Sequence, residues 1–306
     1  MEITFLGTGA GIPSKERNVT AIMLNLTEEN NHLWLFDCGE ATQHQLLHTS
    51  LKPRKINKIF LTHLHGDHLF GLPGLISSRS FLAGDDTLTI YGPKGLKQFV
   101  ETALHISDTH LSYPLEFVEI TEASTIFEDD DFIVDTTLLD HGVTSLAYRI
   151  CEKDRLGELN AQKLRALGIK PGPIYRQIKE NDQTKLDDGT VINRKDFLGE
   201  PKKGRTIAIF GDTRYVPETA SFIKNADVLI HEATFAADKI DLAHKYFHTT
   251  TTQAAKLASD SGVGTLLLTH ISSRYQKEDE AMLLAEARTV FKNTYIAADF
   301  YQFKVK

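Results

Sequence analysis

The sequence predicts an α/β fold with one large hydrophobic core. Short apolar segments of strand character alternate along the chain with segments of helical periodicity, an order typical of α/β proteins. Of the 306 residues, 41% are hydrophobic, which is enough for a single large domain. No apolar run of about 18 residues is present, and the first residues form neither a basic leader nor a signal-peptide core. We therefore expect neither export nor membrane insertion.

The predicted elements follow from local pattern. Five apolar segments predict strands at residues 3–6, 21–26, 33–36, 58–61 and 87–91. Two helices are predicted nearer the other end of the chain. Residues 254–262 follow a run of threonines that can cap a helix, and residues 278–291 include Leu283, Leu284 and Ala287 among their apolar positions.

The run THLHGDH at residues 62–68 is the strongest indication of function. It follows a predicted buried strand, so it lies on a strand-end loop that a rigid sheet can hold. His63 and His65 alternate and share one face of an extended chain, whereas the turn after them aims Asp67 and His68 at a neighbouring point. Imidazole and carboxylate suit Zn²⁺ and, less selectively, Mn²⁺, Fe²⁺ or Co²⁺. The alternative is a hydrogen-bonded turn that happens to be rich in histidine.

Three more candidate ligands stand elsewhere in the chain. His141, Asp212 and His270 each come directly after an apolar stretch that predicts a strand. A lone histidine after a strand is more often an ordinary loop residue than a ligand. Together with residues 62–68, however, these three side chains indicate a metal site along one edge of a sheet.

The run resembles the HxHxDH signature of the metallo-β-lactamase superfamily, which is intact here. This resemblance implies an αββα sandwich with a binuclear metal site at one edge. Matched by position, the first metal would be held by His63, His65 and His141, the second by Asp67, His68 and His270, and Asp212 would bridge them. The superfamily includes lactamases, thioester hydrolases, redox flavoproteins and nucleases, so the signature alone does not identify a substrate.

Further segments resemble the ribonuclease Z family in its short form, over essentially the whole chain. These segments are FLGTG at 5–9, the PxKxRN loop at 13–18, HEATF at 231–235, HTT at 248–250 and AADF at 297–300. The family's HST motif has threonine here in place of serine, which keeps a hydroxyl. The resemblance implies an endonuclease that trims the 3′ end of precursor tRNA.

The reaction expected from this resemblance is zinc-dependent hydrolysis of one phosphodiester by a metal-bridging hydroxide, with two zinc ions per subunit or another divalent cation such as Mn²⁺. Asp67 would orient the hydroxide, and Glu232 would align His248 to protonate the leaving 3′ oxygen. The products would be a tRNA 3′-hydroxyl and a trailer 5′-phosphate.

The resemblance also implies residues that contact the substrate. Lys15, Arg17 and Asn18 would lie near the RNA 3′ end, although a flexible basic loop that does not bind RNA is the alternative. Arg214, Arg274 and Tyr275 are further candidates for substrate contact, because they are close in sequence to ligands.

One segment, about residues 152–203, interrupts the α/β pattern and predicts a protruding arm with little core of its own. It has 12 basic and 9 acidic residues, whereas the remaining chain has 22 basic and 32 acidic residues. Residues 160–179 contain five basic residues and no acidic one. This basic strip comprises Lys163, Arg165, Lys170, Arg176 and Lys179. On composition alone the strip could equally be a solvated surface. Resemblance favours an exosite that grips the tRNA elbow, with the family's GP motif at Gly172 and Pro173.

The overall charge and the cysteines limit the remaining possibilities. The net charge of −7 argues against a generally nucleic-acid-binding surface, so DNA is not an expected partner. The only cysteines, Cys38 and Cys151, are too few for a disulfide framework and favour a reducing compartment, the cytoplasm. The family also implies a homodimer. For the other histidines, a surface or packing role is expected for His32, His44, His48, His105, His110 and His244.

Two other classes of function remain open from the sequence. A small-molecule hydrolase of the same superfamily, such as a thioesterase or sulfatase, would need the same metals but neither the arm nor His248. A non-catalytic RNA-binding scaffold would have no use for an intact set of metal ligands.

Overall fold

The computed structural model describes residues 1–306 and divides into two compact units. The first comprises Met1–Cys151 and Thr206–Lys306, and the second is the inserted segment Glu152–Arg205. Each unit has its own hydrophobic core.

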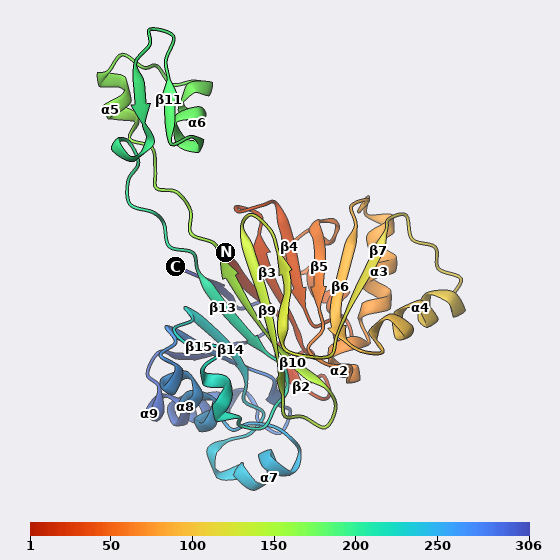
Figure 1. Cartoon of the computed structure of the whole chain (residues 1–306). Helices are drawn as coiled ribbons and strands as arrows, with labels where there is room; N and C mark the ends of the chain where they lie inside the picture. Colours follow the sequence, from red (N-terminus) through yellow and green to blue (C-terminus); the bar gives the residue numbers. More distant parts are fainter. The chain divides into compact units, whose positions relative to one another are not determined.

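Two seven-stranded sheets form the first unit (Figure 1). In spatial order, the first sheet consists of β18 (Gln302–Lys304), β1 (Glu2–Gly7), β3 (Ala21–Leu26), β4 (His32–Phe36), β5 (Ile56–Phe60), β6 (Leu88–Pro93) and β7 (Leu115–Ile120). The second consists of β17 (Thr294–Ile296), β15 (Thr265–Thr269), β14 (Val228–Glu232), β13 (Thr206–Phe210), β10 (Ser145–Glu152), β9 (Phe132–Leu139) and β8 (Ser124–Glu128). The five predicted strands are confirmed.

Aromatic side chains from both sheets fill the core between them. Trp34, Phe36 and Phe60 of the first sheet are fully buried in the same cluster as Phe132 and Tyr148 of the second. Phe36 and Phe60 stack with their ring centroids 4.8 Å apart. Such rings bury large apolar areas, so this cluster accounts for much of the stability of the sandwich.

Helices cover the outer face of each sheet, which makes the α/β/β/α layering that the superfamily resemblance implied. The first sheet is covered by α1 (Thr42–Leu47), α3 (Leu72–Phe81) and α4 (Leu96–Ile106), and the second by α8 (Thr251–Ser261) and α9 (Glu280–Val290). Helix α8 begins at the expected threonine run: Thr250 and Gln253 form a capping box, and Gly262 ends the helix with a left-handed backbone.

The remaining elements of this unit are short. They are α2 (Gly66–Leu69), α7 (Ile240–Lys245), the 3₁₀ turns Pro53–Lys55, Pro217–Ala220, Ala237–Lys239 and Lys277–Asp279, and the parallel pair β2 (Gly9–Ala10) and β16 (Ile271–Ser272). That pair brings the N-terminal loop next to the end of β15. None of the helices is both long and apolar enough to cross a bilayer.

The inserted unit contains α5 (Ala161–Ala166), α6 (Pro173–Glu180), the hairpin of β11 (Gln183–Lys185) and β12 (Val191–Asn193), and the 3₁₀ turn Arg194–Asp196. The predicted small hairpin is therefore present. Its core is small, as expected: Leu164, Ile169, Ile178 and Ile192 pack together as a buried cluster. These apolar residues are spread over short elements, so no single stretch shows their periodicity.

Candidate metal centre and active site

The candidate ligands lie where strands end at one edge of the sandwich. β5 leads into the His63 loop, β9 into His141, β13 into Asp212 and β15 into His270. β13, β14 and β15 are parallel neighbours, so their carboxyl ends meet at the same edge. In α/β sheets this edge is the usual place for a ligand site.

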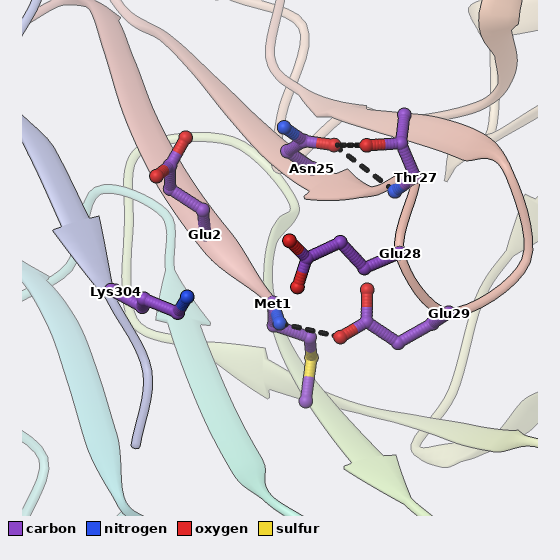
Figure 2. Close-up of a pocket in the computed structure, with 7 residues that line it drawn as sticks. All are labelled: Met1, Glu2, Asn25, Thr27, Glu28, Glu29 and Lys304. Atoms are coloured by element: carbon purple, nitrogen blue, oxygen red, sulfur yellow. Dashed lines mark hydrogen bonds and ion pairs between the residues drawn. The ribbon is translucent and has the colours of Figure 1, made fainter.

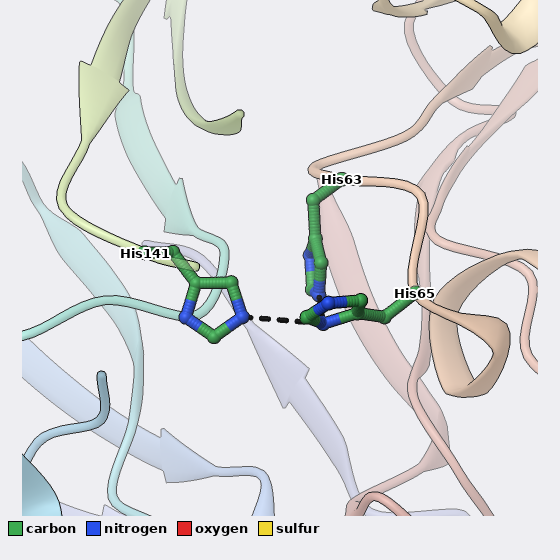
Figure 3. A group of neighbouring side chains, drawn as sticks. All are labelled: His63, His65 and His141. Atoms are coloured by element: carbon green, nitrogen blue, oxygen red, sulfur yellow. Dashed lines mark hydrogen bonds between the residues drawn. The ribbon is translucent and has the colours of Figure 1, made fainter. Parts of the chain in front are cut away.

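Three imidazoles form one group (Figure 3). His65 Nδ1 lies 3.1 Å from His63 Nε2 and 3.2 Å from His141 Nε2. His141 Nδ1 is 2.9 Å from the carbonyl oxygen of Phe247, so Nδ1 carries the hydrogen and Nε2 points inward with a lone pair. Burial lowers the pKa of both His63 and His141, which keeps their rings neutral and able to bind a cation.

Asp37 fixes the orientation of two ligands. Its carboxylate accepts hydrogen bonds from the Thr62 hydroxyl at 2.8 Å and from His68 Nδ1 at 2.8 Å. Because the Thr62 hydroxyl donates to Asp37, it accepts from His63 Nδ1 at 3.1 Å. Both rings therefore point Nε2 toward the cluster, as orienting carboxylates around metal ligands commonly ensure.

Glu232 and Thr234 repeat this arrangement for His270. The Thr234 hydroxyl donates to Glu232 at 2.7 Å and accepts from His270 Nδ1 at 3.0 Å. His270 has a left-handed backbone, with φ of 56°, a strained conformation that is found most often at functional sites. Its Nε2 lies 3.4 Å from the Asp67 carboxylate, which also accepts a hydrogen bond from the Gly11 amide at 2.8 Å.

Asp212 lies between the two histidine groups. One of its carboxylate oxygens is 3.7 Å from His63 Nε2, 3.5 Å from His68 Nε2 and 3.3 Å from His270 Nε2. This is the position that a bridging ligand requires. Burial favours the neutral acid, but the nearby His270 and His68 outweigh it and hold the pKa of Asp212 well below its usual range.

The chemistry of these donors fits divalent metal ions. Four groups have ligand atoms within 4.8 Å of one another: His63/His65/His141, His63/His68/Asp212, Asp67/His68/His270 and Asp212/His248/His270. Burial disfavours a charged His68, but Asp212 and Asp37 raise its pKa well above the usual range, so this point attracts positive charge. A bound cation would replace that proton and neutralise the carboxylates.

The predicted pair Glu232 and His248 is in contact. His248 Nδ1 is 2.9 Å from Glu232 Oε1, and the same carboxylate accepts hydrogen bonds from the backbone amides of Thr213, Thr234 and Thr249. Burial opposes a charged His248, but Glu232 raises its pKa to about 9. A fixed carboxylate thus aligns a protonated imidazole beside the candidate metal ligands.

A cavity of about 390 Å³ opens onto this cluster. His65, Asp67, His141 and His248 line it together with the aromatic side chain of Phe235. The cavity is large enough for a phosphodiester and the adjoining parts of a nucleotide.

The basic loop near the N-terminus differs from its sequence-based expectation at Arg17. Lys15 is exposed, as a substrate contact requires, but Arg17 is only 6% exposed. The Arg17 guanidinium donates to Thr8, to the carbonyl of Ala297 and to Glu280. It therefore anchors the loop rather than presenting a charge to RNA, a role that sequence alone does not distinguish.

Asn18 also fastens this loop. Its side-chain amide donates to the carbonyl of Glu40 at 2.8 Å, and its backbone amide donates to Asp299 at 2.7 Å. Of the three predicted loop contacts, Lys15 is thus the one whose charged group remains exposed.

Within the inserted unit, the five cations of the basic strip are all exposed. Arg176 forms an ion pair with Glu180 at 2.7 Å, so its charge is partly neutralised within the unit. Elsewhere, none of the six histidines expected to have surface or packing roles belongs to a candidate metal group.

Asp37, Thr62 and Thr234 are functional candidates that sequence reasoning missed. Asp37 had the same signal as Asp212, a carboxylate directly after an apolar strand. The threonines had no comparable signal, because their role depends on which carboxylate each hydroxyl meets in the folded chain.

A second cavity, of about 190 Å³, lies away from the cluster and has a different composition (Figure 2). Glu2, Glu28 and Glu29 line it with Lys304, and the N-terminal amine pairs with Glu29 at 2.6 Å. It contains no histidine or cysteine, so it lacks the ligand chemistry of the metal cluster.

Comparisons with known proteins agree with this site. A family model described as a beta-lactamase superfamily domain matches residues 192–271, and one described as anti-Pycsar protein Apyc1 matches residues 1–141. Among solved structures, human tRNase Z, short form, is 28% identical with a TM-score of 0.71, and the alignment covers 100% of both chains. The metallo-beta-lactamase fold protein YhfI from Bacillus subtilis is 22% identical with a TM-score of 0.68, and supports the fold.

Curated relatives are considerably more similar. A protein named Ribonuclease Z from Bacillus cereus (strain G9842) is 57% identical over 306 residues, which cover 100% of both chains. Another of that name from Bacillus anthracis (strain A0248) is 57% identical over 305 residues, covering 100% of this chain and 99% of the other. With this identity over the full length and the ligand cluster assembled at the sheet edge, the chain belongs to the ribonuclease Z family of the metallo-β-lactamase superfamily.

Proposed function

We propose that this protein is a zinc-dependent endoribonuclease that removes the 3′ trailer from precursor tRNA. It would leave a 3′-hydroxyl on the tRNA and a 5′-phosphate on the trailer. The observation that carries the proposal is the clustering of seven candidate metal ligands, five of which line one cavity, beside the Glu232–His248 pair. Membership of the ribonuclease Z family supplies the substrate class.

Two zinc ions per subunit are proposed from the two histidine groups, with Mn²⁺ as another suitable cation. His63, His65 and His141 would hold one ion, and Asp67, His68 and His270 the other, with Asp212 between them. When bound, the ions would supply an activated water near neutral pH and offset the charge on the attacked phosphate.

The protein's own groups would then position and transfer protons. The Gly11 amide fixes one oxygen of Asp67, so this carboxylate can orient the attacking water and accept its proton. At the other side of the phosphate, His248 would protonate the departing 3′ oxygen. Glu232 holds His248 through Nδ1, which leaves Nε2 as the atom that faces the substrate.

Recognition of tRNA is assigned to two exposed regions. Lys15 would contact the RNA near the cleaved bond, and the inserted unit Glu152–Arg205 would bind the tRNA elbow. The strip in that unit consists of Lys163, Arg165, Lys170, Arg176 and Lys179, which are exposed on or near α5 and α6. From the family we further propose a homodimer that acts in the cytoplasm on RNA.

Cleavage of two substrates tests the proposed function. Metal-loaded protein should cut a 3′-extended tRNA transcript once, at the trailer boundary, and should also hydrolyse a nitrophenyl phosphodiester. Hydrolysis of the small diester alone would instead indicate a small-molecule hydrolase. Binding of the transcript without cleavage of either substrate would indicate a scaffold.

A further inference from the structure

Arg214 lies in a segment that carries one member of the site and contacts two other such segments. It lies two residues after Asp212, its backbone amide donates to the carbonyl of Asp140 at 2.9 Å, and its Nε donates to the carbonyl of His244 at 2.7 Å. Its guanidinium carbon lies 3.6 Å from the ring centroid of Phe247. His141 follows Asp140 in the chain, and His248 follows Phe247, so each contacted segment contains a residue of the candidate site.

Phe247 connects the two catalytic segments through its backbone. Its carbonyl oxygen accepts the hydrogen bond from His141 Nδ1, and the next residue in the chain is His248. Phe247 has a φ of 60°, in the left-handed region that a bulky side chain seldom adopts. Such a conformation persists only where neighbouring contacts enforce it.

Two sets of contacts hold this turn. The backbone amides of Phe247 and His248 donate to the carbonyls of His244 and Ala243 and close helix α7 (Ile240–Lys245), and Arg214 packs against the Phe247 ring. The planar guanidinium covers the Phe247 ring, and its Nε secures the carbonyl of His244, three residues earlier. An arginine can make both contacts at once because its donors lie in the plane and its face is free to stack. Lysine has a charge but no such plane.

We propose that Arg214 is a positioning residue: by clamping Phe247 it sets both the ring orientation of His141 and the place of His248. This inference rests on the proposed function for its catalytic consequence, but the positioning itself is a property of the folded chain. The sequence suggested Arg214 as a substrate contact. Its stacking on Phe247, its bond to His244 and its 3.5 Å ion pair with Asp140 instead direct the guanidinium into the protein.

The test uses Arg214→Ala, Arg214→Lys, Phe247→Leu and the double variant Arg214→Ala/Phe247→Leu. Arg288→Ala is the matched control, because Arg288 also covers an aromatic ring, that of Tyr295, and donates through Nε to a backbone carbonyl, but lies on α9. Thermal unfolding identifies any variant that does not fold, and Arg214→Lys provides a milder change at the same position.

We expect Arg214→Ala to lower kcat on precursor tRNA by about 10- to 100-fold and to weaken metal binding in chelator competition by a similar factor, as loss of ligand-orienting groups does. KM should stay unchanged. The effects of Arg214→Ala and Phe247→Leu should be strongly non-additive, because both remove one contact. Arg214→Lys should not restore kcat, and Arg288→Ala should behave as the unmodified protein.

A second readout does not depend on activity. In metal-free protein with ¹⁵N-labelled histidine, NMR should show His141 as the Nδ1-protonated tautomer, and Arg214→Ala should abolish this single state. A raised KM with unchanged kcat would overturn the proposal in favour of direct RNA contact. Additive effects of the two substitutions, or an unaltered His141 signal, would also overturn it. If the unmodified protein fails to cut tRNA, the proposed function fails. The NMR comparison still tests whether Arg214 positions His141.

Discussion

Hydrogen-bond partners determine what each histidine in the cluster can do. His141 donates through Nδ1 to a carbonyl, His68 to Asp37, and His248 to Glu232. In each case the opposite nitrogen is left to face the cavity or cluster. A ring fixed in this way can present Nε2 to a metal ion, and His248, whose pKa Glu232 raises to about 9, suits proton donation.

The proton-donor role proposed for His248 predicts that the effect of its loss depends on the leaving group of the substrate. His248→Ala and Glu232→Ala should each slow tRNA cleavage by about 10²- to 10⁴-fold with metal content unchanged. A nitrophenolate leaves without protonation, so the small diester should be much less affected. The double variant should be little worse than His248→Ala. His105→Ala removes an exposed histidine outside the site and serves as the control. Equal losses on both substrates would exclude this role.

The ligand-orienting role of Asp37 is also testable. Asp37→Asn keeps the shape of the side chain but removes the charge that accepts from His68 and Thr62, so metal affinity should fall by about 10- to 100-fold. Chelator competition measures this directly. Asp135→Asn is the matched control, because Asp135 lies within β9, pairs with Arg149 and belongs to no candidate metal group. Equal affinities for both variants would contradict the assignment.

The candidate ligands could be identified from sequence, but the groups that orient them could not. Residues 62–68 have an uncommon density of donors, and His141, Asp212 and His270 follow recognisable strands. Which carbonyl or hydroxyl meets the far side of each ring depends on loops brought together only by folding. Phe247 illustrates this, because nothing in its sequence surroundings indicates a left-handed backbone.

At the scale of elements, apolar strands and capped helices were predictable because their periodicity is local. The helical turn α2 was not, since Gly66–Leu69 is too short to show a period. The residues that form the small core of the inserted unit could not be identified for a related reason: they come from α5, α6, β12 and the loop at Ile169.

The two cations of the loop at residues 13–18 should have different roles, one in stability and the other in tRNA binding. Arg17→Ala breaks three buried or partly buried hydrogen bonds, so stability should fall by about 1–3 kcal/mol, seen as a lower Tm. Lys15→Ala should leave Tm unchanged and weaken tRNA binding, because Lys15 is exposed. If Lys15→Ala lowered Tm as much as Arg17→Ala, the distinction between contact and anchor would be lost.

For the whole molecule, separate cores predict separable recognition and chemistry. Replacing Glu152–Arg205 with a short Gly/Ser linker should preserve metal binding and small-diester hydrolysis, since no candidate metal ligand lies in this unit. Binding of precursor tRNA should collapse. Unchanged tRNA affinity in a titration at fixed salt would remove the inserted unit from the mechanism.

Charge neutralisation in the basic strip should act electrostatically. Single substitutions of its cations by alanine should weaken tRNA binding modestly, and each true phosphate contact removed should reduce the log–log salt slope by about 0.7 to 0.9. Lys163→Ala removes an exposed cation of α5, whereas Arg176→Ala also breaks the ion pair with Glu180 and should have the smaller effect on the slope. The opposite order would show that the Glu180 pair does not compete with RNA.

The most direct test of the central claim is a zinc titration of metal-free protein with a 3′-extended tRNA transcript, read out by mapping both product ends. We predict no cleavage without metal, a rise to full activity at two equivalents per chain, and a single cut that leaves a tRNA 3′-hydroxyl and a trailer 5′-phosphate. Full cleavage of the transcript by protein stripped of metal, or zinc-loaded protein that leaves it intact, would contradict the account.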